Sequence, residues 1–357
     1  MLEFVCTTLP SRVIFGQGTS VRLPEEVERL GLQRALVLAT PSRKRDAERL
    51  SATLGGCSAG VLATAVMHTP VNVTEAALAV VERLGADGLV AIGGGSTTGL
   101  SKAIALRTDL PQIIIPTTYA GSEMTPSVGE TKDGVKTTQR SPRVLPEVVI
   151  YDVERTLSLP VPLSATSGMN AIAHAVEALY ARDCNPVATL MAEEGVRAFA
   201  RALPRIAAHP VDRDARAEAL YGAWLCGTCL GSVSMAIHHK LCHVIGGLFN
   251  LPHAQTHTVI LSHATAYNAP AAPDAMARLA RALDAPDAAL GLYELAGRLG
   301  CPRSLRDLGM PESGIDQAVT LSLRNAPWNP VPIEAEAVRE LLRRAWRGDV
   351  PASAFQS

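Results

Sequence analysis

The chain has 357 residues, of which 47% are hydrophobic and 19% are charged, and its formal net charge is −1. This length favours two domains over a single core, and the composition excludes an intrinsically disordered protein. A net charge so near zero gives no general attraction to nucleic acid or to an anionic membrane, so we expect neither as a partner. No basic segment followed by an apolar core opens the sequence, and no apolar run is long enough to span a membrane, which predicts a cytoplasmic protein.

Short apolar runs alternate with amphipathic stretches in the first half of the chain. We expect buried strands at residues 34–40, 88–92, 112–115 and 148–151, and a helix over residues 72–84. Strands that alternate with helices are typical of a parallel sheet with right-handed crossovers. We therefore predict an α/β dinucleotide-binding domain with a parallel sheet over residues 1–157.

Strand signals end after the proline-rich stretch at residues 158–162. The segments that follow are rich in alanine, leucine and other helix formers, and the clearest are residues 168–182, 186–202, 213–230 and 334–346. We predict an all-helical catalytic domain over residues 158–357. Within it, Cys226 and Cys229 have CxxC spacing without a second pair, so we expect a buried helical pair, with a redox or metal role as the alternative.

A glycine-rich loop follows the expected strand at residues 88–92 and leads into a helix at residues 100–106. Its residues are Gly93, Gly94, Gly95 and Ser96. Consecutive glycines let the backbone approach a pyrophosphate closely, and a helix N-terminus supplies unpaired N–H groups and a favourable dipole. The alternative is a tight turn without a ligand, and the spacing is not the GxGxxG of an ordinary Rossmann fold.

A second polar loop follows the expected strand at residues 112–115 and contains Thr117, Thr118 and Ser122. Ligands of parallel sheets bind at the carboxyl ends of the strands, so this loop is predicted to form a second wall of the nucleotide site. A polar loop without a ligand is the alternative.

Cofactor choice depends on Thr40, at the end of the expected strand over residues 34–40. NAD-specific sites place a carboxylate near the adenosine ribose, but Thr40 and the two residues after it carry none. The basic run Arg43, Lys44 and Arg45 is placed to meet a 2′-phosphate, or it is the solvated start of a helix. We therefore predict that NADH and NADPH are both used.

Histidines form the most informative pattern, because six of the chain's nine lie between His238 and His263. Residues four apart share a helix face, so we expect His239 and His243 to project together, as do Asn170 and His174 on another helix. These two faces are predicted to meet His253 around one cavity. His238 adjoins this group, whereas His257 and His263 are expected to be supporting or structural residues.

The same residues resemble a metal site that lacks one ligand. Imidazole binds zinc, iron and nickel, but such a cation usually also has a carboxylate ligand that offsets its charge. Asn170 offers only a neutral amide at that position. The pattern predicts a site that works without metal.

Five motifs together resemble the iron-containing alcohol dehydrogenase superfamily and, within it, the maleylacetate reductases. They are IGGGSTT, PTTYAGSEMT, GMNAIAHAVEALY, HHKLCHVIGG and LPHAQTHTVIL. The resemblance covers nearly the whole chain. It implies the dehydroquinate synthase-like fold, an active site in the cleft between the two domains, and a homodimer.

Metal-dependent members of that superfamily carry an aspartate and a histidine four residues apart, followed by two further histidine ligands. Asn170 stands at the aspartate position, while His174, His239 and His253 match the histidines. His243 matches a histidine beside the nicotinamide. A second departure is Gly99, which stands where the glycine loop usually has an aspartate, and both departures resemble maleylacetate reductases.

The resemblance implies that NADH or NADPH reduces the carbon–carbon double bond of maleylacetate, a small dicarboxylate, to 3-oxoadipate during the degradation of aromatic compounds. No metal is expected. We expect His243 to be the principal acid or oxyanion donor, in a pocket lined by His174, His238, His239, His253 and Asn170. Lys240, Arg140, Arg143 and Arg324 remain open as partners of the substrate carboxylates.

Two alternatives remain open. One is a metal-dependent alcohol or polyol dehydrogenase that binds iron, zinc or nickel through three histidines and water. The other is a nucleotide-binding or scaffold protein without catalytic activity. Retention of both loops and of every motif histidine argues against the second.

Overall fold

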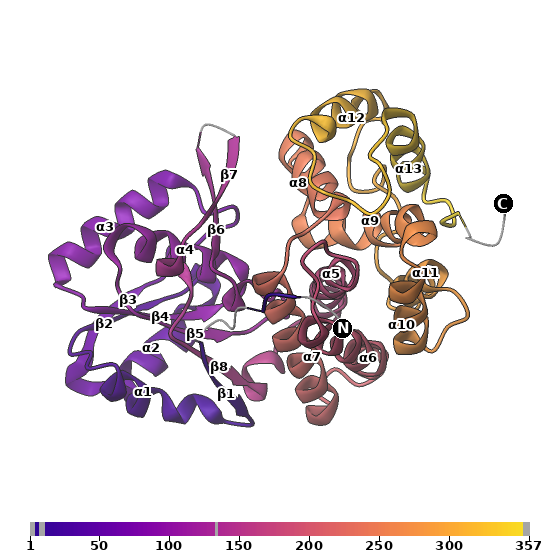
Figure 1. The fold of residues 1–357 in the computed structure, drawn as a ribbon. Coiled ribbons are helices and arrows are strands. Elements are labelled where there is room, and N and C mark those ends of the chain that lie inside the picture. Colours follow the sequence, from indigo (N-terminus) through magenta and orange to yellow (C-terminus); the bar gives the residue numbers. More distant parts are fainter. Residues whose placement is uncertain (1–3, 7–10, 133–134, 353–357) are drawn as a thin grey trace. The chain divides into compact units, whose positions relative to one another are not determined.

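The structure is a computed structural model that describes residues 4–6, 11–132 and 135–352 (Figure 1). The described chain forms two compact units. One comprises residues 11–159, and the other comprises residues 160–352 together with residues 4–6. Among the described residues, no single helix is both long and apolar enough to cross a membrane; only one pair of helices, bent by 95° at the break between them, passes that test together.

The first unit is built on a six-stranded parallel sheet in the order β1-β8-β5-β4-β2-β3. Its strands are β1 (Arg12–Gly16), β2 (Ala35–Leu38), β3 (Ser58–Leu62), β4 (Gly88–Gly93), β5 (Gln112–Pro116) and β8 (Val148–Asp152). The four strands expected from apolar runs are the four inner ones. The sequence did not predict the edge strands β1 and β3, because neither is a continuous buried run.

Helices cover both faces of this sheet. Figure 1 shows α3 (Val71–Leu84) and α4 (Gly95–Thr108) on one side, and α1 (Leu23–Arg29) and α2 (Lys44–Thr53) on the other. Successive strand residues alternate between the two hydrophobic cores, so that Leu36 packs with α3 and α4 while Val37 packs with α1 and α2. Burial on both faces explains why the inner strands are uniformly apolar.

An antiparallel hairpin of β6 (Ser127–Lys132) and β7 (Val135–Arg140) lies outside the main sheet and was not predicted. Its residues mix polar and apolar types without a long buried run. Periodicity therefore gave no signal for it.

The second unit contains helices and, among its described residues, no strand. The helices are α5 (Val161–Leu179), α6 (Pro186–Ala208), α7 (Arg213–Ser232), α8 (Ile237–Phe249), α9 (His253–Asn268), α10 (Pro273–Leu283), α11 (Ala288–Arg298), α12 (Ile315–Leu323) and α13 (Ala335–Arg347). The predicted division into an α/β part and an all-helical part is confirmed. The helix expected from residue 168 begins at Val161 instead, because Pro162 suits the first turn of a helix.

α5 is the central helix of this unit and is buried almost throughout its length. It packs against α6, α7 and α9, and α9 packs in turn against α8. Cys226 and Cys229 are buried on α7, as expected, and burial raises the pKa of the Cys229 thiol to about 12. The helices that carry the motif histidines, α5, α8 and α9, are therefore packed together through α9.

Candidate active site

Three helices of the second unit bring six neighbouring histidines into one cluster. They are His174 on α5, His238, His239 and His243 on α8, and His253 and His257 on α9. The ring centroids of His174 and His239 lie 5.0 Å apart, and those of His243 and His253 lie 6.1 Å apart. His243 is exposed and His253 is half-buried, whereas the other four rings are buried. The cluster therefore has an accessible edge formed by His243 and His253.

Four buried side chains form a chain of hydrogen bonds: Glu177, His239, His174 and Asn170. The two end residues decide which atom donates in each bond. Nδ1 of His239 lies 2.7 Å from Oε2 of Glu177, and Nε2 of His239 lies 2.9 Å from Nδ1 of His174. Nε2 of His174 lies 3.4 Å from the amide nitrogen of Asn170. A carboxylate only accepts and an amide nitrogen only donates, so each histidine donates through Nδ1 and accepts through Nε2. Both rings are thereby held as neutral tautomers.

Glu177 is a residue of this cluster that the sequence reasoning missed. Its carboxylate is fully buried on α5 and accepts the backbone N–H groups of Ala236 and His238 at 2.8 and 2.7 Å. Glu177 thus ties α5 to the start of α8 and orients His239 at the same time. A signal existed, because Glu177 is three residues after His174, on the same helix face, and is the only carboxylate of α5.

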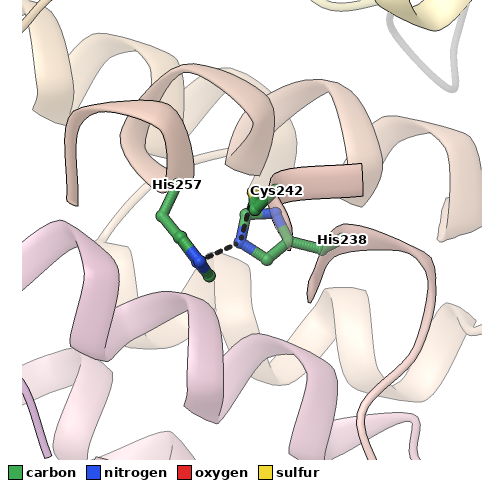
Figure 2. A group of neighbouring side chains, drawn as sticks. All are labelled: His238, Cys242 and His257. Atoms are coloured by element: carbon green, nitrogen blue, oxygen red, sulfur yellow. Dashed lines mark hydrogen bonds between the residues drawn. The ribbon is translucent and has the colours of Figure 1, made fainter. Parts of the chain in front are cut away.

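A second buried group lies beside this chain and joins α8 to α9. Figure 2 shows His238 and His257 turned toward each other, with Nε2 of His238 3.0 Å from Nδ1 of His257 and 3.7 Å from Sγ of Cys242. Burial lowers the pKa of both histidines well below the usual value and raises that of the Cys242 thiol well above it. Both rings are therefore neutral, and the thiol keeps its proton.

His257 is more central than the sequence indicated. Its ring centroid lies 4.3 Å from that of His253 and 5.0 Å from that of His239. It also contacts the rings of His174, His238 and His243. We expected His257 to be a supporting residue outside the histidine group. Helix α9 begins at His253, however, so His257 follows one turn later on the same face and joins the group.

The residues at the superfamily's metal-ligand positions do not fit an iron site. Asn170 is neutral, and the Nε2 lone pair of His239 is directed at Nδ1 of His174. Among the described residues, the ligand atoms that lie within 4.8 Å of one another belong to His238, Cys242 and His257, a set that contains none of the matching histidines. This set has no carboxylate that would offset the charge of an iron ion.

In the first unit, the glycine loop has the close packing and open space that a dinucleotide needs. A Cβ on Gly93 would lie 2.2 Å from Oγ1 of Thr97, and one on Gly94 would lie 2.8 Å from the side chain of Thr118. Gly95 begins α4 and has nothing within 4 Å of its Cβ position. Space therefore remains beside Gly95 in the first turn of α4, and N–H groups at a helix N-terminus can bind a phosphate.

The second polar loop lies beside the glycine loop, as expected from adjacent parallel strands. The N–H of Thr117 donates to the carbonyl of Gly93 at 2.9 Å, and Thr118 packs against Gly94. Ser122 follows in the same loop, and its hydroxyl is buried without a hydrogen-bond partner among the described residues. A buried donor of this kind fits a ligand that supplies the missing bond.

Thr40 lies two residues after the end of β2, and its hydroxyl is 3.0 Å from that of Ser42. The basic run beyond it has partners on its own helix. Arg43 pairs with Asp46 at 3.1 Å, and Lys44 pairs with Glu48 at 3.8 Å. These pairs support the interpretation of a solvated helix start for two of the three basic residues.

Two of the four cations considered for the substrate carboxylates lie together in the second unit. Nζ of Lys240 donates to the backbone carbonyl of Arg324 at 2.8 Å. Arg143 belongs to the first unit, where its guanidinium is 3.7 Å from Asp109. Lys240 directly follows His239 on α8, which makes it the cation nearest in sequence to the cluster.

Comparison with known proteins agrees with this arrangement. Residues 10–153 match the family model for iron-containing alcohol dehydrogenase, and residues 164–346 match that for the C-terminal part of the Fe-containing alcohol dehydrogenase family. The chain is 58% identical to the maleylacetate reductase of a Rhizobium species, covering 98% of this chain and 100% of that one. It is 55% identical to that of Sphingobium indicum, covering 99% and 100% of the two chains.

Solved structures of maleylacetate reductases are also similar to this chain. The crystal structure of maleylacetate reductase from Agrobacterium tumefaciens superposes with a TM-score of 0.95 at 56% identity, covering 98% of this chain and all of that one. Both domains, both loops and the complete set of histidines lie within the matched length. The chain therefore belongs to the iron-containing alcohol dehydrogenase family and, within it, to the maleylacetate reductases.

Proposed function

We propose that this protein uses NADH or NADPH to reduce the carbon–carbon double bond of maleylacetate to 3-oxoadipate in the breakdown of aromatic compounds. The observation that carries the proposal is the 58% identity, over essentially its full length, to a protein named maleylacetate reductase. The neutral amide of Asn170 supports it, because this residue hydrogen-bonds to His174 where metal-dependent members of the family are expected to have a carboxylate ligand.

The first unit holds the cofactor in this proposal. Helix α4 begins at Gly95, whose Cβ position is open, and its N-terminal N–H groups are assigned to the pyrophosphate. The hydroxyl of Ser122 has no hydrogen-bond partner among the described residues and is assigned as a further donor. The nicotinamide, when bound, supplies the hydride. We infer that Thr40 leaves the ribose 2′ position free of a repelling carboxylate, so that either cofactor is accepted.

The second unit supplies the donors for the substrate. A double bond conjugated to a ketone takes hydride at its far carbon, and the negative charge collects on the ketone oxygen. One well-placed donor to such an oxygen is worth about 3 kcal/mol. His243 and His253 form the accessible edge of the cluster, whereas His239 is buried. We therefore assign His243 as the principal oxyanion donor or acid, with His253 beside it.

The reaction proceeds without metal in this proposal. The support is the neutral amide of Asn170 and the Nε2 lone pair of His239, which accepts a hydrogen bond from Nδ1 of His174. The homodimer and the dicarboxylate specificity stay predictions at this stage.

A substrate panel measured by NADH absorbance in the presence of a chelator tests the proposal. Maleylacetate should be reduced at the same rate with and without chelator, and 3-oxoadipate should form in equal amount to the NADH consumed. Primary alcohols and diols offered with NAD⁺ form the control panel. Alcohol oxidation that the chelator abolishes would instead establish the metal-dependent dehydrogenase.

A further inference from the structure

The buried Lys102 has no part in the function proposed so far, although it is among the largest side chains that are completely enclosed. It lies on α4, seven residues after Gly95, which begins the helix. An ammonium group is almost never fully buried unless it is paired, because removing its charge from water is costly. Its position therefore requires a specific set of partners.

Those partners all belong to the second polar loop and the start of β6. Nζ of Lys102 donates to the backbone carbonyls of Ser122, Thr125 and Ser127, and it lies 3.0 Å from Oγ1 of Thr125. Burial lowers the pKa of Lys102 to about 7, and the carboxylate of Glu123 opposes that shift. Three carbonyl acceptors match the three donors of an ammonium group, whereas a neutral amine has only two.

The loop is held from a second side by Tyr151 on β8. The hydroxyl of Tyr151 donates to Oε1 of Glu123 at 2.9 Å, and both groups are fully buried. Glu123 is the residue next to Ser122, whose hydroxyl is buried without a partner among the described residues. The segment around Ser122 is thus held by hydrogen bonds from Lys102 and, through Glu123, from Tyr151.

We propose that Lys102 is a positioning residue for the nicotinamide cofactor, because it fixes the loop around Ser122 at a set distance from the glycine loop. Helix α4 connects the two loops: it begins at Gly95 of the glycine loop, and Lys102, two turns later, binds the loop around Ser122. A ligand that contacts both loops binds more tightly when their spacing is set beforehand, because no binding energy is used to order them. The inference rests on the proposed function only for the identity of the cofactor.

Substitution Lys102→Met tests the proposal, because it keeps an unbranched side chain and removes every donor. NADH and NADPH affinities are measured by titrating cofactor fluorescence without substrate. We expect the Kd for both cofactors to rise at least tenfold. The matched control is Arg107→Met on the same helix, a cation whose partners are the carbonyl of Ala103 and Glu130 outside the loop, and it should change Kd less than about threefold.

Two further measurements keep the proposal open to refutation. Tyr151→Phe removes only the hydrogen bond to Glu123 and should raise the Kd by a smaller factor. This variant tests the proposal if Lys102→Met does not fold. Hydrogen exchange of the amides at residues 117–126, measured without cofactor, should accelerate in Lys102→Met relative to the Arg107→Met control.

Unchanged exchange in this loop would overturn the anchoring role whatever the cofactor turns out to be. Faster exchange with unchanged Kd would overturn the link to cofactor binding. A wild-type protein that binds neither NADH nor NADPH would refute the proposed function instead, and the exchange data would still decide whether Lys102 holds the loop.

Discussion

Nδ1 of His239 lies 2.7 Å from the carboxylate of Glu177. The carboxylate of this site therefore binds a histidine ring and does not occupy a metal-ligand position. At the position four residues before His174, where a metal-dependent relative has aspartate, this chain has Asn170. The negative charge is therefore present but is used to fix tautomers through a chain of hydrogen bonds. The following predictions test the consequences of this arrangement.

Glu177→Gln should destabilise the protein and reduce kcat. An amide presents one acceptor oxygen, whereas the carboxylate accepts from Ala236, His238 and His239. Leaving buried donors unsatisfied costs about 1–3 kcal/mol, and an amide N–H facing Nδ1 would favour the other tautomer of His239. Urea unfolding measures the loss. Glu336→Gln is the control, since that carboxylate is 75% exposed in its pair with Arg339 and should contribute less than about 1 kcal/mol. Equal losses in the two variants would contradict the assigned role.

Purified protein should contain little iron or zinc, and chelation should leave the reduction of maleylacetate unchanged. The reason is the neutral amide of Asn170 together with the hydrogen bond between His174 and His239. Elemental analysis and activity after dialysis against chelator measure both quantities. Asn170→Asp adds the missing charge and should bring measurable zinc affinity in calorimetry. Stoichiometric metal whose removal abolishes wild-type activity would refute the prediction.

His243→Ala should lower kcat by roughly 10²–10⁴, the usual contribution of general acid–base help, with little change in the KM for NADH. His243 is exposed at the accessible edge of the cluster, so its removal leaves the buried hydrogen-bonded chain in place. Steady-state kinetics with maleylacetate give both parameters. His263→Ala is the control, because His263 is buried on α9 and is not one of the six clustered rings. A variant that keeps more than half of the wild-type kcat would remove His243 from the mechanism.

Gly99→Ala should destabilise the protein by about 1–3 kcal/mol, the usual cost of overpacking. A Cβ at this position would lie 2.3 Å from Oγ1 of Thr69, which also explains why the aspartate of the superfamily's glycine loop does not fit here. Thermal unfolding measures the loss. Adding Thr69→Ala should recover most of it, because the clashing oxygen is then gone. Gly246→Ala serves as the control, since nothing lies within 4 Å of its Cβ position; a similar loss there would disprove the steric explanation.

Both cofactors should be used, with kcat/KM values within about a hundredfold of each other, or ~2.7 kcal/mol. No carboxylate follows β2 at Thr40, and Arg43 and Lys44 are occupied by Asp46 and Glu48, so neither cofactor is strongly favoured. Kinetics with each cofactor at saturating maleylacetate give the ratio. Thr40→Asp should lower NADPH use selectively, because its charge repels the 2′-phosphate. Discrimination above about a thousandfold in the wild type, or undiminished NADPH use in the variant, would refute this prediction.

Local patterns in the sequence determined the main features of the fold. Inner strands of a parallel sheet are buried on both faces, so β4 and β5 were visible as apolar runs. The edge strands β1 and β3 and the hairpin β6–β7 were not, because partial burial leaves no such run. Spacing of four residues on a helix likewise placed Asn170 with His174 and His239 with His243, since helix geometry alone decides which residues share a face.

Only the tertiary structure decided which atoms of the site are joined. Glu177, His257 and Lys102 have hydrogen-bond partners at least 59, 19 and 20 residues away, on other elements, and no local periodicity encodes such contacts. A carboxylate, an imidazole or an ammonium group looks the same in a sequence whether it is solvated or buried. The tertiary structure decides its partner: hydrogen bonds join Glu177 of α5 to α8, His257 of α9 to His238 of α8, and Lys102 of α4 to the polar loop.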